Sequence, residues 1–293
     1  MIEQTPILLA LIGDPVQHSV SPYMHSFFLH ILKRPGCYHL FPTKKETLAE
    51  VVAGMKALSF SGFNITIPHK ETILPLLDEI DADAQTIGAV NAVVIRDRKL
   101  FGFNTDCLGF ARVLNHHQVQ IQNQSVVVLG AGGAARAVCV HLIRAGVKKI
   151  DLFNRSQIRM IQLQTSLTRK TGFTRFSLNE LSDSSLDQAL THSQVIINTT
   201  SAGMWPQIED SPYSFEIDGA GLVAIDLIYN PLETAFLRAA KHAGASIIDG
   251  LDMLILQGVA SFKLWTNCSI DLKMNYSKLR TLLIKRLTVD GTN

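Results

Sequence analysis

The amino-acid sequence predicts an α/β fold with mainly parallel sheets. Short apolar runs alternate with helix-length segments almost throughout the chain, which is the pattern of successive strand–helix–strand units. Near the middle, a continuous apolar run leads into a glycine-rich turn and a helix rich in small residues. The 293 residues, 47% of them hydrophobic, suffice for one or two domains of ordinary size.

The first hundred residues are predicted to form strands with a clear helix after the first of them. "PILLALIG" at 6–13 predicts a buried strand, and "SPYMHSFFLHIL" at 21–32 predicts the following helix. We expect Ser21 to cap this helix and Pro22 to occupy its first position. The further predicted strands are "GFNITIP" at 62–68 and the hairpin-like pair "AVNAVVIR" at 89–96 and "KLFGFNTD" at 99–106.

The second half of the chain begins after a predicted helix at 108–117, which is a candidate bridge between domains. Residues 125–156 are predicted to form a strand, a glycine-rich turn, a helix and a second strand, a βαβ unit of the expected length. Strands at 194–200 and 222–230 continue the alternation, and a long helical stretch ends the chain.

Composition and charge exclude several classes of protein. The formal net charge is +2 with no dense Lys/Arg run, so no nucleic-acid partner is expected. The four cysteines share no CxxC spacing and no Cys/His cluster, so we expect no metal site, no disulfide framework and a reducing, cytoplasmic location. Residues 13–15, Gly-Asp-Pro, break the first apolar run, and no stretch has the ~18 apolar residues of a membrane span.

The glycine-rich turn predicts a dinucleotide site. The turn Gly130-Ala131-Gly132-Gly133-Ala134 follows a buried-strand run and opens a helix, whose free N–H groups can meet a pyrophosphate. The usual GxGxxG pattern is not complete, because Ala135 or Arg136 stands at the last glycine position.

The end of the second strand of this unit indicates NADP over NAD. NAD-binding folds commonly place an acidic residue there, but this strand ends in Asn154-Arg155-Ser156, with Arg159 one turn further on. A guanidinium fork suits a 2′-phosphate. The competing carboxylate, Asp151, lies three residues earlier, within the strand.

Taken together, the motifs resemble the shikimate dehydrogenase family over most of the chain. Nine stretches follow the family's order: Ser19–His25, Gly62–Lys70, Gly88–Ala92, Gly102–Phe110, Gly130–Ala137, Asn154–Ser156, Asn198–Met204, Asp226–Thr234 and Gln257–Gly258. Two departures are Ala92, where the family usually has Thr, and Ser26, where it often has Asn.

This resemblance implies an NADP-linked, reversible reduction of 3-dehydroshikimate to shikimate in aromatic amino-acid biosynthesis. It implies an α/β substrate domain at 1–105, completed by C-terminal helices at 252–293. A Rossmann-type NADP-binding domain at 106–251 includes the bridging helix. The active site is expected in the cleft between the two domains.

The resemblance also implies that Lys70 and Asp106 are the catalytic pair. Hydride transfer to a ketone leaves an alkoxide, so the protein must supply a proton to that oxygen. A lysine can supply it when burial or cationic neighbours lower its pKa toward neutrality. A carboxylate such as Asp106 can orient the ammonium by a charge-assisted hydrogen bond. The competing interpretation is a solvated loop lysine and a helix N-cap.

The remaining site residues come from the resemblance and from the polar character of the substrate. Shikimate carries a carboxylate and three hydroxyls, so its pocket needs several small polar groups. The expected substrate-binding residues are Ser19, Ser21, Asn64, Thr66, Asn91, Tyr229 and Gln257. The expected cofactor contacts beyond the glycine-rich turn and the arginines are Thr200, Met204 and Gly250.

Other hypotheses stay open. A quinate/shikimate dehydrogenase that uses NAD would have the same motifs, and a non-catalytic dinucleotide-binding sensor would keep the fold without activity. His25 and His69 are interpreted as structural hydrogen-bonders, and His116-His117 as a solvated helix end. Monomer and homodimer are both compatible with the sequence.

Overall fold

The computed structural model describes residues 5–290 and divides the chain into two compact units. The first unit comprises the described residues up to Gly109 together with those from Ile255 onward, and the second comprises Phe110–Leu254. Both divisions fall inside helices, α4 (Asp106–His116) and α9 (Leu251–Thr266). The functional-domain boundaries expected at 105/106 and 251/252 stay predictions.

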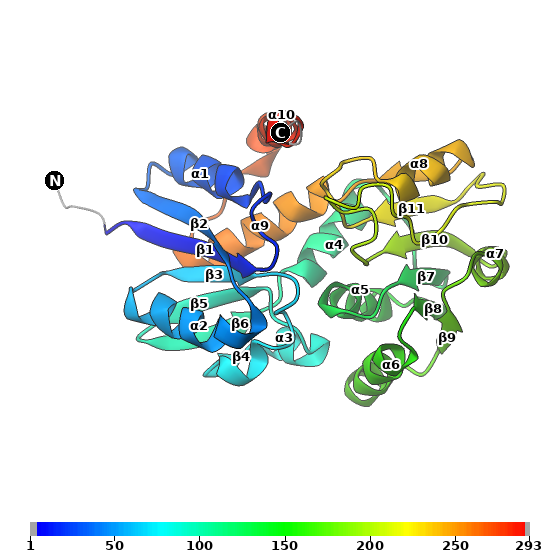
Figure 1. Cartoon of the computed structure of the whole chain (residues 1–293), viewed down its shortest axis with the longest axis horizontal. Helices are drawn as coiled ribbons and strands as arrows, with labels where there is room; N and C mark the ends of the chain where they lie inside the picture. The colour runs from blue at the N-terminus through cyan, green and yellow to red at the C-terminus, as the bar shows by residue number, and fades with distance from the viewer. Residues whose placement is uncertain (1–4, 291–293) are drawn as a thin grey trace. The chain divides into compact units, whose positions relative to one another are not determined.

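The first unit contains a mixed six-stranded sheet in the order β2-β1-β3-β5-β6-β4 (Figure 1). β1 is parallel to β2 and β3, whereas β3, β5 and β6 are successively antiparallel and β4 is parallel to β6. β5 and β6 are the predicted hairpin. The strands are β1 (Ile7–Gly13), β2 (Gly36–Pro42), β3 (Gly62–Ile65), β4 (Glu79–Ile80), β5 (Ala92–Arg96) and β6 (Lys99–Phe103).

Helices cover this sheet through apolar side chains at helical spacing. Leu48, Val52 and Met55 of α2 lie in one core cluster with the central strands. Trp265 of α9 donates from Nε1 to the carbonyl of Val93 in β5 at 2.9 Å, which ties the late helix to the early sheet. The helices are α1 (Ser21–Ile31), η1 (Lys45–Thr47), α2 (Leu48–Ala57), η2 (Leu74–Leu76), α3 (Ala82–Ile87), the first turn of α4, most of α9, and α10 (Leu272–Asp290).

The prediction that Ser21 caps α1 is wrong. Helix α1 begins at Ser21, Val20 holds the cap position, and no side chain there accepts from the first turn. Instead, the hydroxyl of Ser19 accepts from the N–H of Ser21 at 3.2 Å and donates to its hydroxyl at 3.1 Å. The capping bond is therefore replaced by a turn that pairs the two serines.

The second unit contains a fully parallel six-stranded sheet in the order β12-β11-β10-β7-β8-β9 (Figure 1). The order reverses direction between β7 and β10, the point at which such sheets bind ligands at their carboxyl ends. The strands are β7 (Ser125–Leu129), β8 (Lys149–Asn154), β9 (Phe176–Glu180), β10 (Ser193–Asn198), β11 (Val223–Asp226) and β12 (Ser246–Ile248).

Helices lie on both faces of this sheet, as right-handed crossovers require. Leu186 and Leu190 of α7 and Phe236 of α8 share one core cluster with Val127 and Ile196 of the sheet. Helix α5 connects β7 to β8, and helix α6 connects β8 to β9. Both lie on the face of the sheet opposite to α7 and α8 (Figure 1). The helices are α5 (Gly133–Arg144), α6 (Gln157–Thr171), α7 (Asp183–Leu190) and α8 (Ala235–His242). Among the described residues, no helix combines the length and apolar character needed to cross a membrane.

Candidate active site

Lys70 and Asp106 form a short ion pair in the first unit. Lys70 Nζ donates to Asp106 Oδ2 at 2.5 Å, and the two side chains are 19% and 7% exposed. The carbonyl of Lys70 accepts from the N–H of Val90 at 2.8 Å, so the lysine's backbone is fixed next to β5. Asp106 begins α4, where the free N–H groups of the first turn stabilise a carboxylate. The competing interpretation of a solvated loop lysine does not describe this geometry.

Asn91 fixes the other oxygen of the carboxylate. Its side-chain amide donates to Asp106 Oδ1 at 2.8 Å, and its own Oδ1 accepts from the N–H of Thr105 at 2.7 Å. The side-chain oxygen of Asn104 accepts from the N–H groups of Asp106 and Cys107, which caps α4. Both oxygens of Asp106 therefore have donors, and the carboxylate is held in one orientation.

The network continues from α4 into α9. Thr105 Oγ1 lies 3.0 Å from Ser261 Oγ, and either hydroxyl can donate. Gln257 Oε1 accepts from Thr105 Oγ1 at 3.3 Å and from the amide of Asn91 at 3.4 Å. Gly109 lets these helices approach closely, because a Cβ there would lie 2.8 Å from the Cβ of Gln257. Gln257 is thus brought to the Lys70–Asp106 network from far along the chain.

Asn64 joins the same network from β3. Its amide donates to the carbonyl of Asn91 at 2.9 Å and to Ser261 Oγ at 3.0 Å, and its Oδ1 accepts from the hydroxyl of Tyr38 at 2.9 Å. Thr66 lies just beyond the end of β3, half-buried, with its N–H bound to the carbonyl of Ile12. The structure therefore joins five predicted residues in one bonded network: Lys70, Asp106, Asn64, Asn91 and Gln257.

Sequence reasoning missed three members of this network, Tyr38, Thr105 and Ser261. Thr105 lies inside the motif Gly102–Phe110, directly before Asp106. Ser261 follows Gln257 by four residues, so the two share a helix face, and this spacing could have identified it. Tyr38 lies in β2, and no local pattern connects it with Asn64.

In the second unit, the glycine-rich turn has the shape that a pyrophosphate requires. Gly130 has a φ of +108°, and a Cβ there would lie 2.6 Å from Thr199 Oγ1, so only glycine suits this position. Gly132 immediately precedes α5, and a Cβ at this residue would meet open space. The space and the free N–H groups at the start of α5, which begins at Gly133, fit the phosphates of NADP.

The end of β8 fits a 2′-phosphate. Arg155 and Arg159 are exposed, and Ser156 caps α6 by accepting from the N–H of Arg159. The amide of Asn154 donates to the carbonyl of Ser156 at 3.1 Å, which shapes this turn. Asp151 is buried and bound to Lys149 Nζ at 2.6 Å, so this carboxylate already has a cationic partner.

The other predicted cofactor residues lie near the carboxyl ends of the same sheet. Thr200 follows β10 and donates from Oγ1 to Asn198 Oδ1 at 2.7 Å. Met204 closes the next turn by a bond from its N–H to the carbonyl of Ser201. Gly250 packs so tightly that a Cβ would overlap the carbonyl oxygen of Leu227. Tyr229, which is predicted to bind the substrate, is half-buried after β11.

Burial decides the roles of the two motif histidines. His25 stacks on Tyr38 with ring centroids 4.3 Å apart, and neither ring nitrogen has a hydrogen-bond partner among the described residues. The prediction that His25 is a hydrogen-bonder is therefore wrong. Burial lowers its pKa to about 3, so the ring is a neutral part of an aromatic core. For His69 the prediction is confirmed, since Nε2 lies 2.6 Å from the carbonyl of Thr43.

Segments of both units match family models built from known proteins. Residues 11–93 match the family model for the shikimate dehydrogenase substrate binding domain, 113–209 that for shikimate / quinate 5-dehydrogenase, and 250–273 that for the shikimate 5′-dehydrogenase C-terminal domain. A shikimate dehydrogenase (NADP(+)) from Bacillus anthracis is 41% identical over 281 residues, covering 96% of this chain and 98% of the relative.

The chain belongs to the shikimate dehydrogenase family. Solved structures of the family share its fold. A crystal structure of a shikimate dehydrogenase in complex with NADP+ matches with a TM-score of 0.86 and 37% identity, covering 96% of each chain. A quinate dehydrogenase from Corynebacterium glutamicum in complex with NAD matches with a TM-score of 0.83 and 30% identity, covering 96% of this chain and 99% of that one.

Proposed function

We propose that this chain is an NADP-dependent enzyme that reversibly reduces 3-dehydroshikimate to shikimate in aromatic amino-acid biosynthesis. The observation that carries the proposal is the 2.5 Å hydrogen bond between Lys70 and Asp106. It occurs in a chain that is 41% identical to a relative named shikimate dehydrogenase (NADP(+)).

In this mechanism, Lys70 is the proton donor. NADPH, when bound, supplies the hydride. Reduction of the ketone places negative charge on its oxygen, and the ammonium of Lys70 gives that oxygen a proton; in the reverse direction the amine takes it back. Asp106 holds the ammonium through Oδ2, and Asn91 holds Asp106 through Oδ1. The lysine is 19% exposed, so its proton can be replaced from solvent.

The substrate is proposed to bind through the polar side chains around this pair. Asn64, Thr66, Asn91 and Gln257 are suited to the ring hydroxyls, because amides and hydroxyls both donate and accept. Ser19 and Ser21, together with Tyr229, are assigned to the carboxylate. Because buried polar groups need partners, an analogue that lacks a ring hydroxyl should bind much more weakly.

The cofactor is proposed to bind along the carboxyl edge of the parallel sheet. The turn from Gly130 to Ala134 would hold the pyrophosphate, and Arg155 and Arg159 the 2′-phosphate, with Asn154 and Ser156 shaping that turn. Thr200, Met204 and Gly250 are assigned to the nicotinamide half. The exposed arginine forks and the paired state of Asp151 favour NADP over NAD.

The likeness to a quinate dehydrogenase with NAD supports a second candidate function, a quinate/shikimate enzyme that prefers NAD. Initial rates for shikimate or quinate, each with NADP or NAD, separate the two. We expect activity mainly with shikimate and NADP. Comparable quinate turnover would contradict the serine assignment, NAD preference would contradict the arginine assignment, and no turnover in any combination would favour a non-catalytic sensor.

Lys70→Ala tests the chemistry itself. We expect turnover to fall by roughly 100-fold or more, since a positioned acid contributes that much, while NADPH binding stays near the parent value. Lys99→Ala is a matched control, because Lys99 is 60% exposed and paired only loosely with Glu79. If Lys70→Ala keeps more than about a tenth of the turnover, Lys70 is not the proton donor.

A cytoplasmic location is also proposed, because all four cysteines are free. The choice between monomer and homodimer, and the absence of a nucleic-acid partner, stay predictions from the sequence.

A further inference from the structure

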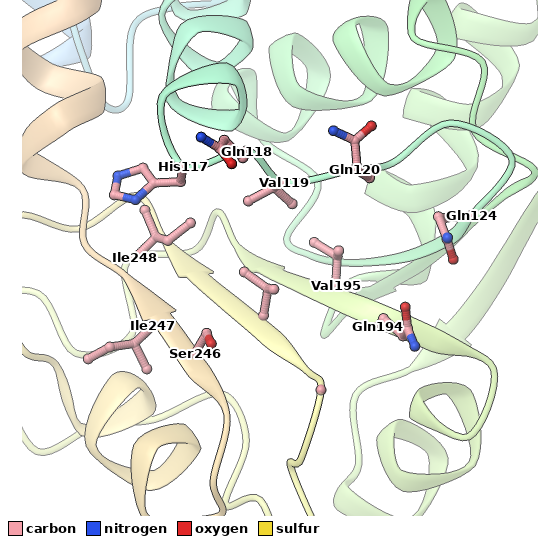
Figure 2. Close-up of a pocket in the computed structure, with 12 residues that line it drawn as sticks. His117, Gln118, Val119, Gln120, Gln124, Gln194, Val195, Ser246, Ile247 and Ile248 are labelled. Carbon is pink, nitrogen blue, oxygen red and sulfur yellow. The ribbon is translucent and has the colours of Figure 1, made fainter.

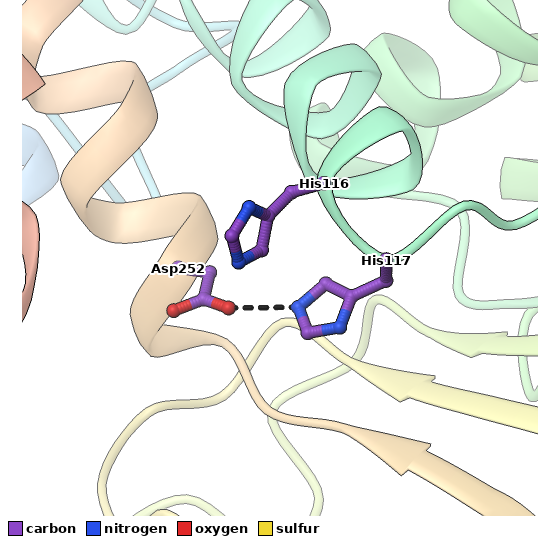
Figure 3. A group of neighbouring side chains, drawn as sticks. All are labelled: His116, His117 and Asp252. Carbon is purple, nitrogen blue, oxygen red and sulfur yellow. Dashed lines mark hydrogen bonds and ion pairs between the residues drawn. The ribbon is translucent and has the colours of Figure 1, made fainter. Parts of the chain in front are cut away.

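A cluster of metal-ligating side chains lies in the second unit, on residues that the proposed reaction does not use. One ligand atom from each of His116, His117 and Asp252 lies within 4.8 Å of the other two (Figure 3). His117 Nε2 is 2.8 Å from Asp252 Oδ2, and the two imidazole rings are nearly perpendicular, with centroids 4.9 Å apart. From the sequence, no metal site is expected, because the cysteines share no CxxC spacing and no Cys/His cluster, and Asp252 is far from the two histidines along the chain.

The end of α4 holds the two histidines in place. Consecutive residues of a helix normally point in different directions. Here the helix ends at His116, and Gln118 takes a left-handed φ of 55°. The N–H of Gln118 bonds to the carbonyl of Asn115, and the N–H of Val119 to that of Leu114, which is the Schellman pattern of a helix C-terminus. This closure fixes His117 at the cap position, with its ring toward Asp252 (Figure 3).

The start of α9 holds the carboxylate. Asp252 lies in the first turn of α9, which begins at Leu251, and its side chain is 6% exposed. The side chain of Asp249 accepts from the N–H of Leu251 at 2.9 Å and so fixes the entry to the helix. The two histidines therefore lie at the C-terminus of α4, whose negative dipole end favours a cation, and the carboxylate of Asp252 is held by the start of α9.

We propose that His116, His117 and Asp252 form a zinc site. Two imidazoles and one carboxylate are the donor set of three-ligand zinc centres, which keep a fourth position for water. Ligand atoms about 2.0–2.1 Å from zinc in a tetrahedron lie roughly 3.3 Å apart. On binding, the 2.8 Å distance between His117 Nε2 and Asp252 Oδ2 would increase slightly, and the longer distances between ligand atoms would shorten. Rotation of the side chains can produce changes of this size. Binding replaces the hydrogen on His117 Nε2, which moves to Nδ1 or to solvent.

A hollow lies beside the cluster, on the side of His117. The same histidine lines this hollow of about 330 Å³ at the amino ends of β10, β11 and β12 (Figure 2). Four glutamine side chains line it: Gln118, Gln120, Gln124 and Gln194. Because the dinucleotide turn follows the carboxyl end of β7, this hollow lies at the other edge of the sheet and is not the cofactor site.

Zinc titration of the untagged, chelator-treated protein tests the site. We expect one equivalent of Zn²⁺ to bind with a Kd on the order of 1 µM or tighter by calorimetry. Excess zinc should also raise the thermal midpoint by about 3 °C or more. His116→Gln, His117→Gln and Asp252→Asn should each weaken binding at least about tenfold. His192→Gln is a matched control, since this exposed histidine of the same unit is outside the cluster.

Co²⁺ in place of Zn²⁺ gives a geometric readout, because its visible absorption reports tetrahedral coordination. The bands should be present in the parent protein and in His192→Gln, and absent from the three ligand variants. Each variant should retain the parent turnover in the absence of zinc, which shows that it is folded. Equal zinc affinity in the ligand variants and the parent protein would place the metal elsewhere, for example on thiols, and would overturn the proposal. Failure of the parent protein to bind zinc would do the same.

Discussion

Replacing Ser261 by alanine should destabilise the first unit by an amount that follows from its contacts. Ser261 is fully buried, and its hydroxyl accepts from the amide of Asn64 at 3.0 Å and shares a hydrogen with Thr105 Oγ1 at 3.0 Å. Each of those two partners keeps another bond, Asn64 to the carbonyl of Asn91 and Thr105 to Gln257. No partner becomes an isolated buried group, so the penalty is the net value of two hydrogen bonds, about 2 kcal/mol.

The chain supplies a matched control in Ser193→Ala. Ser193 is also buried, at 3% exposure, but its hydroxyl has no hydrogen-bond partner among the described residues. Removing a buried hydroxyl that makes no bond should leave the free energy of unfolding unchanged or raise it. Both substitutions delete one oxygen from a buried serine, so the hydrogen bonds of Ser261 are the main difference between them; the higher helix propensity of alanine in α9 makes the measured difference a lower bound on their contribution.

Urea unfolding followed by tryptophan fluorescence and circular dichroism measures both variants. The midpoint for Ser261→Ala should move to lower urea, corresponding to a roughly 30-fold smaller ratio of folded to unfolded protein. If Ser261→Ala and Ser193→Ala have the same free energy of unfolding within about 0.5 kcal/mol, the network around Ser261 contributes nothing measurable and the reasoning is refuted.

Two further predictions concern pH. Burial lowers the pKa of His25 to about 3, so the unfolded chain binds its proton first on acidification, and stability that is complete above about pH 6.5 is lost as pH falls. By pH 5 the free energy of unfolding of the parent protein should fall by about 2 kcal/mol more than that of His25→Phe. If the free energies of unfolding of the two proteins change in parallel with pH, the prediction is contradicted. Asp226 has the opposite sign, because burial raises its pKa to about 6 despite hydrogen bonds from Ile228 and Thr234. Its stabilising contribution is complete below about pH 4 and is lost as pH rises through about 6. In the parent protein this contribution should lower the free energy of unfolding by about 3 kcal/mol between pH 4 and 7, and Asp226→Asn should abolish that decline. Thermal melts from pH 4 to 7 measure it, and an unchanged decline in the variant would count against the raised pKa.

Local sequence patterns predicted the parts of the fold that local physics determines. The turn from Gly130 to Gly133 was predictable because a buried strand, a positive φ and a helix start all lie within a few residues. The capping role of Ser21 failed because α1 already begins at Ser21, and the carbonyl of Val20 accepts from the N–H groups of Tyr23 and Met24.

The composition of the network around Lys70 and Asp106 could not be derived from local patterns. Asn91 and Gln257 are 166 positions apart, and only the packing of α9 against the first sheet brings them together. The same limit applies to Asp252, 135 positions from His117. His25 shows a different limit, because its motif indicated a hydrogen-bonding role, whereas the aromatic rings around it decided its environment.

The interrupted first unit has a consequence for synthesis on the ribosome. Residues 110–254 are contiguous, so the second unit has its whole sequence available before the chain is complete. The first unit waits for Gln257, Ser261 and Trp265, the last of which bonds to the carbonyl of Val93. Domains generally fold as units while the chain emerges, in the order in which their sequences are completed. The nucleotide-binding fold can therefore form first, and the network around Lys70 and Asp106, although its lysine is made early, is assembled last.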